Sequence, residues 1–230
     1  MTHEKSKEEL LQNIDNTSKA IINMGEQLVA ITPKIQVFDM FLIAILNRTV
    51  NLNKAFTSLI RDKNFIAAAP LVRINLDSLM RIFAARISDY DINTFALKVM
   101  QGDFIKNMKA KGTKDKLSDT YLVARLSEIE DMEWVKNVYA AGNSFVHFGD
   151  NIIFSSQQIT NESEKTIGLS IGFHDAFIPE AEKMGAVIWM NKINSSIIMQ
   201  GQIWMLEKSQ ANGFDIEKLN DPKYVKSTTA

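Results

Sequence analysis

The residues between positions 134 and 149 include four polar side chains that could do chemistry together. Tyr139, Asn143 and His147 are spaced i, i+4, i+8, so they share one face if this stretch is an α-helix. Ser144 lies beside that face. The neighbouring positions are mostly apolar, and polar groups in an apolar setting need partners, either inside the protein or in a ligand. The pattern therefore predicts a polar cluster, although it does not select one reaction.

Within this cluster, His147 has the chemistry of a general acid or base. It falls in the last turn of the predicted helix, where the helix dipole favours a protonated imidazole by about 0.3–1 kcal/mol. Such a group could transfer a proton near neutral pH, or it could only donate to a free carbonyl at the helix end. Gly142 costs the same helix about 1 kcal/mol relative to Ala. This glycine indicates either close helix packing or space for a ligand.

A second charged line falls on a very apolar helix that we predict over residues 65–87. Arg73, Asp77 and Arg81 are again spaced i, i+4, i+8, so Asp77 can pair with either arginine. The planar fork of Arg73 can bind a phosphate or a carboxylate, and Asp77 would orient it. The line faces solvent or a cleft. We expect it to supply partners for the polar cluster around His147.

The composition is that of a globular protein without redox or metal chemistry based on thiolates. The chain has 230 residues, 46% of them hydrophobic and 23% charged, with a net charge of −1 and no cysteine. This charge gives no global attraction to nucleic acid or anionic membrane. The three histidines are too dispersed to suggest a metal site. We predict no metal and no cofactor, no signal peptide or membrane contact, and a cytoplasmic location.

Hydrophobic periodicity predicts an all-α fold, a helical bundle of about six or seven helices. A single helical domain would occupy residues 1–212, followed by a polar C-terminal tail at 213–230. Ser6 starts the first helix with a capping-box pattern, Thr32 and Pro33 start the second, and Asp131 caps the helix that ends at Gly149. The predicted helices cover about residues 6–31, 32–61, 65–87, 94–108, 117–129, 131–149 and 179–207.

One small β-hairpin is expected before the last long helix. Residues 151–159 and 166–171 are rich in β-forming side chains and flank a polar loop, so the hairpin would span about 151–171. The last helix, about 179–207, is apolar on a broad arc. That breadth predicts either burial on several sides or a dimer surface.

Taken together, these motifs resemble HEPN-type helical proteins over about residues 35–205, closest to a poorly characterised bacterial branch often found near defence systems. The resemblance rests on Arg-x-x-x-acid (Arg73 to Asp77) and on Tyr-x-x-x-Asn-Ser-x-x-His (Tyr139 to His147), followed by the hairpin. It implies an all-helical, homodimeric, metal-independent ribonuclease in which a histidine is the acid or base. The resemblance also implies an arginine a few residues before that histidine on the same helix, but no arginine stands four to six residues before His147. We infer that Arg73 supplies the cation.

Two hypotheses of different classes follow. The first is a HEPN-like protein that binds RNA or a nucleotide phosphate, as a ribonuclease-type defence or stress factor. The second is a non-enzymatic helical interaction or dimerisation module whose polar cluster is structural. Under the first hypothesis the catalytic residues are His147, Arg73, Asn143 and Ser144, and the ligand-binding residues are Asp77 and Tyr139.

Overall fold

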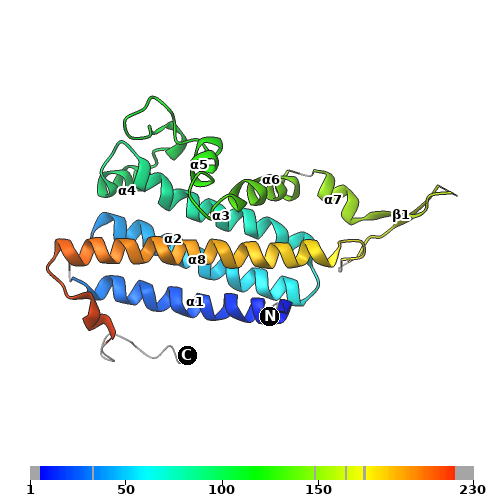
Figure 1. The fold of residues 1–230 in the computed structure, drawn as a ribbon, viewed down its shortest axis with the longest axis horizontal. Coiled ribbons are helices and arrows are strands. Elements are labelled where there is room, and N and C mark those ends of the chain that lie inside the picture. The colour runs from blue at the N-terminus through cyan, green and yellow to red at the C-terminus, as the bar shows by residue number, and fades with distance from the viewer. Residues whose placement is uncertain (1–5, 33, 148, 164, 173–174, 221–230) are drawn as a thin grey trace.

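The protein is an elongated assembly of helices with one projecting hairpin (Figure 1). The structure, a computed structural model, describes residues 6–32, 34–147, 149–163, 165–172 and 175–220. The all-α class is confirmed, with eight α-helices in this part of the chain and a hairpin before the last of them. The helices are α1 Lys7–Ala30, α2 Val37–Arg61, α3 Phe65–Ile87, α4 Ile92–Met100, α5 Asp119–Leu126, α6 Trp134–Val146, α7 Asp150–Ser155 and α8 Glu180–Ala211, and the strands are β1 Gln157–Asn161 and β2 Thr166–Leu169.

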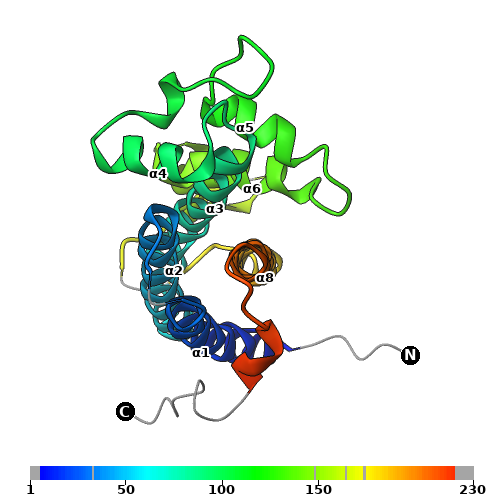
Figure 2. The same ribbon diagram turned by 90° about the vertical axis from the view of Figure 1, so that its left-hand side faces the viewer.

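Four long helices, α1, α2, α3 and α8, form the main bundle, as the end view in Figure 2 shows. The last helix packs against the other three, so its apolar arc is buried on several sides within the chain. This accounts for most of the arc, while Ile188, Met199 and Leu206 of α8 stay exposed. The bundle core includes Ile14, Phe38, Phe56, Leu76 and Ile197.

A second layer of shorter helices covers the other side of α3. In Figure 2, α4, α5 and α6 lie on the side of α3 that faces away from α1 and α8. Both α5 and α6 contact α3, so this helix is packed between two layers. This position explains why almost every residue of α3 is apolar. The helix continues through Pro70, which stands in its second turn.

Two helix starts differ from the sequence prediction. The first helix begins with the expected capping box of Ser6 and Glu9. The second begins at Val37 and not at Thr32, because Gln36 and Asp39 form a capping pair there; Pro33 lies outside the described residues. Asp131 is not the cap of α6: it has a positive φ of 64°, and its carbonyl accepts a hydrogen bond from the Trp134 indole.

The segment after α6 is where the sequence prediction was wrong. The helix ends at Val146, not at Gly149, and residues 150–155 form the short helix α7 where we predicted a strand. The Ser144 hydroxyl accepts a hydrogen bond from the backbone N–H of Asn151 at 3.1 Å, which satisfies a first-turn donor of α7. The hairpin is therefore shorter than predicted, and the helix count is higher by one.

The C-terminal end of α8 leads into a further ordered turn. The helix ends at Ala211, four residues beyond the predicted end at Glu207. Residues 216–220 of the expected polar tail form a 3₁₀ helix with Leu219 buried. The Gln27 side chain donates to the Leu219 carbonyl at 3.4 Å. Residues 221–230 lie outside the described part of the chain.

A buried ion pair fixes the same end of the bundle. Lys208 Nζ donates to Asp39 Oδ2 at 2.7 Å and to the Leu28 carbonyl at 2.8 Å, and the Trp204 indole donates to Asp39 Oδ1 at 2.8 Å. The Lys208 and Asp39 side chains are fully buried. These contacts connect α1, α2 and α8, and they satisfy charges that would otherwise be very costly to bury.

We expect Lys208→Met to lower the free energy of unfolding by about 3–5 kcal/mol, because it leaves Asp39 buried without its cation. The matched control is Lys192→Met, an exposed lysine on the same helix, with an expected loss below about 1 kcal/mol. Urea denaturation of both variants measures the difference. Equal losses would contradict the role given to the buried pair.

Candidate functional site

Arg73 leaves α3 at the point where α3 and α6 come closest. A Cβ placed at Gly142 of α6 would lie 2.5 Å from the Arg73 Cβ, which is closer than real carbon contacts allow. Of the two sequence interpretations of Gly142, close helix packing is therefore confirmed. The arginine side chain is mostly buried, with 12% of its surface exposed.

Three side chains surround the Arg73 guanidinium. Its carbon lies 4.2 Å from the centroid of the Tyr139 ring, in a cation–π contact. Nε donates to Asn143 Oδ1 at 3.3 Å, and Nη2 donates to Asp119 Oδ2 at 3.3 Å. The predicted association of Arg73 with Tyr139 and Asn143 is thus present. The carboxylate that orients Arg73 is Asp119 and not Asp77.

The Arg73–Asp119 contact is one end of a series of ion pairs. We call this series the ion-pair chain, and its members in order are Arg48, Asp77, Arg81, Asp119 and Arg73. Arg81 donates to Asp119 Oδ1 at 2.9 Å and also pairs with Asp77. Arg48 Nη1 donates to Asp77 Oδ2 at 3.1 Å. Burial alone would lower the pKa of Arg81, but Asp77 and Asp119 outweigh it and the pKa is raised. The predicted Asp77–Arg81 pair is confirmed, and both carboxylates bridge two arginines.

Ser144 and His147 have other surroundings. The Ser144 hydroxyl donates to Asp150 Oδ1 at 2.6 Å, and this bond lowers the pKa of the Asp150 carboxyl. His147 is the exposed C-cap residue of α6, and its backbone N–H donates to the Asn143 carbonyl at 2.9 Å. No described residue forms a hydrogen bond or ion pair with its imidazole. The structure therefore joins Arg73, Tyr139 and Asn143, but not Ser144 or His147, in one set of contacts.

Sequence reasoning missed Asp119 and Arg48. Asp119 stands in the first turn of α5, after the N-cap Ser118. An acidic residue at that position is common for local reasons, since it complements the helix dipole. Its longer-range role follows only from the packing of α5 on α3. Arg48 likewise has no nearby partner in α2 that would indicate its ion pair with Asp77.

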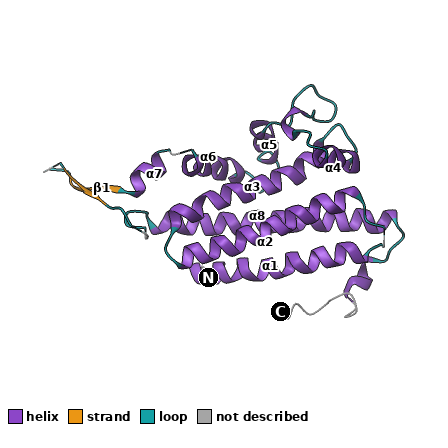
Figure 3. Cartoon of the chain, turned by 180° about the vertical axis from the view of Figure 1, so that it is seen from behind, coloured by secondary structure: helices purple, strands orange, loops and turns teal. Residues whose placement is uncertain are grey.

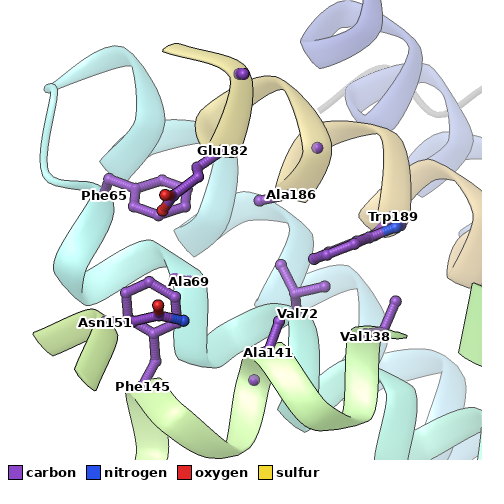
Figure 4. Close-up of a pocket in the computed structure, with 13 residues that line it drawn as sticks. Phe65, Ala69, Val72, Val138, Ala141, Phe145, Asn151, Glu182, Ala186 and Trp189 are labelled. Carbon is purple, nitrogen blue, oxygen red and sulfur yellow. The ribbon is translucent and has the colours of Figure 1, made fainter. Parts of the chain in front are cut away.

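An apolar pocket, also missed, lies beside this cluster between α3, α6, α7 and α8 (Figure 4). Its volume is about 370 Å³. Gly142 belongs to its lining, so the same glycine borders both Arg73 and the pocket. No periodicity marks such a space, because it arises where small residues of separate helices face one another. Its small residues include Ala69, Ala141, Gly185 and Ala186.

Comparison of the chain with protein-family models, with curated proteins and with solved structures gives no match. The resemblance to HEPN-type proteins therefore stays a prediction. Among the described residues, no helix is long and apolar enough to cross a bilayer. In the same part of the chain, no group of three or more His, Cys, Asp or Glu side chains is placed to hold a metal ion.

We expect Arg73→Ala to lower the free energy of unfolding by about 2–4 kcal/mol, because it removes a buried cation that holds Asp119 and stacks on Tyr139. Arg48→Ala is the control, since Arg48 belongs to the same chain of ion pairs but is 44% exposed. Its expected cost is below about 1 kcal/mol. Urea denaturation compares them, and a cost for Arg73→Ala as small as that of Arg48→Ala would contradict this assignment.

Proposed function

We propose that this protein is a non-enzymatic helical interaction module that forms a homodimer through its projecting hairpin. The observation that carries the proposal is one apolar face of that hairpin, which extends away from the body of the molecule (Figure 3). The side chains of Ile159, Ile167 and Leu169 on this face are 63%, 60% and 77% exposed, and Ile171 beyond β2 is fully exposed.

The register of the hairpin places these residues together. Ile159 on β1 is opposite Ile167 on β2, and Leu169 lies two residues further along the same strand, so all three point to one side. The other side differs. A Cβ built at Gly168 would lie 3.5 Å from the Phe177 ring, so a residue of the chain already covers part of that side.

This exposed apolar face lowers the stability of the hairpin unless something covers it. An isolated two-stranded hairpin is marginal in water and needs a further apolar surface. Burying each large aliphatic side chain contributes about 1.5–3 kcal/mol. Contacts with another molecule are therefore the natural source of stability for β1 and β2.

A second copy of the chain is the occupant that fits best. The Ile159–Ile167 pair and Leu169, which is opposite Gln157, form an apolar row that can pack on the same row of a second copy under two-fold symmetry. The turn carries Glu162, Glu164 and Lys165 in its sequence, so each copy brings charges of both signs. A stable interface buries roughly 800 Å² per partner, so a dimer through the hairpin would have to bury most of this face.

The ion-pair chain supports the non-enzymatic part of the proposal. Arg73 has Asp119, Asn143 and Tyr139 as partners, and Arg81 has two carboxylates. A phosphate would have to compete with carboxylates that are already in place. Arg73, Tyr139, Asn143 and Asp119 then act as a structural connection between α3, α5 and α6, in which His147 takes no part.

We expect the wild type to be a dimer, and Ile159→Thr combined with Ile167→Thr to be a monomer. Threonine keeps the β-branched shape but removes apolar area. Gln158→Thr, on the opposite face of β1, is the matched control and should remain dimeric. Sedimentation velocity gives the mass and circular dichroism checks the fold. A monomeric wild type, or a folded double variant that stays dimeric, would refute the proposal.

The phosphate hypothesis is the second candidate, favoured by one observation. Arg73 Nη1 donates no hydrogen bond to a described residue, and His147 is exposed one helical turn from Asn143. A phosphate that reached Nη1 would gain a further donor if the His147 imidazole turned toward it. The interaction module that we propose does not require His147 to move toward Arg73.

We expect the wild type to leave single-stranded RNA intact in buffer containing a metal chelator, with no difference from His147→Ala. Gel analysis of a labelled RNA measures cleavage. Cleavage by the wild type that disappears in a folded His147→Ala variant would establish the phosphate hypothesis in place of the interaction module.

A further inference from the structure

We infer that the apolar pocket between α3, α6, α7 and α8 binds a small amphipathic cation, an amine attached to an aromatic or branched aliphatic group. This site is separate from the hairpin face and goes beyond the proposed function. Its volume of about 370 Å³ falls within the usual range of small-molecule sites, which is roughly 300–1,000 Å³.

Small residues keep the pocket open. A Cβ built at Gly185 of α8 has no atom within 4 Å, so the space beside this glycine is empty. A glycine inside a helix also costs about 1 kcal/mol relative to Ala, without any packing reason at this position. Gly142 differs, because a Cβ there would meet Arg73. Gly185 therefore leaves room for a ligand, whereas Gly142 leaves room for the Arg73 side chain.

Aromatic rings form the walls that an apolar group would contact. Phe65 and Phe145 meet edge to face, with ring centroids 5.6 Å apart. Trp189 also lines the pocket, and in Figure 4 it lies toward the other end from the two phenylalanines. Rings arranged in this way bind aromatic or aliphatic groups, and their faces also attract a cation.

The charge of the lining selects a cation over an anion. Among the described residues that line the pocket none is Lys or Arg, and Glu182 is the one charged side chain. Glu182 is exposed, and no described residue pairs with its carboxylate, whereas its neighbour Glu180 pairs with Lys7 and Lys183. In Figure 4 the Glu182 carboxylate and the Asn151 amide lie toward the end that the phenylalanine rings form. An ammonium group there would have both a carboxylate and aromatic faces.

The test uses the full chain and three probes of one shape: 4-phenylbutylamine, the neutral 4-phenylbutan-1-ol and the anionic 4-phenylbutyrate. Isothermal titration calorimetry should give a Kd below about 1 mM for the amine, weaker binding of the alcohol and the weakest of the carboxylate. No binding of the amine at millimolar concentration, or equal binding of the amine and the carboxylate, would overturn the inference.

Two variants locate the site. Gly185→Leu fills the empty space and improves helix propensity, so it should abolish binding without loss of thermal stability. Glu182→Gln should weaken amine binding about fivefold and leave the alcohol unchanged, since it removes only the charge. Glu180→Gln, in the same turn but outside the pocket, is the control and should bind as the wild type does. Binding that survives in folded Gly185→Leu, or amine affinity that is unchanged in Glu182→Gln, would overturn the inference.

Discussion

The ion-pair chain that runs from Arg48 to Arg73 connects the two layers of the molecule. Asp119 is the member that joins the layers, because it stands on α5 and accepts hydrogen bonds from both Arg73 and Arg81 of α3. Arg73 then reaches α6 through Asn143 and Tyr139. The position of α6, in turn, sets one wall of the apolar pocket and the direction in which α7 and the hairpin leave the body. The two proposed interaction surfaces therefore both depend on these charges.

The same contacts explain why residues that look reactive in the sequence need not be catalytic. A guanidinium that is mostly buried requires carboxylate and amide partners, and Arg73 has both. Asn143 is one of those partners. Ser144 satisfies the start of α7. Each of these polar groups has a structural duty that accounts for its place on an otherwise apolar helix.

Helical periodicity and capping signals predicted most of the fold, including the capping box at Ser6, the full extent of α3 and the start of α8 near Pro179. The prediction was wrong at residues 150–155, because β-forming side chains there join a helix whose first turn is satisfied by Ser144. Spacing predicted that Tyr139 and Asn143 share a face, and Arg73 was expected as a partner, but Asp77, Ser144 and His147, expected at the same site, do not contact the Arg73 guanidinium. Asp119 and the pocket could not be predicted from spacing, because both arise from packing between segments that are distant in sequence.

The most direct test of the account is the coupling free energy between Arg73 and Asp119, from a double-mutant cycle with Arg73→Ala and Asp119→Ala. If these residues hold the second layer on α3, their effects on the free energy of unfolding should be non-additive by more than about 1 kcal/mol. Inorganic phosphate should leave the stability of the wild type unchanged. Additive effects, together with stabilisation by phosphate that Arg73→Ala removes, would show that Arg73 serves a ligand and not the fold.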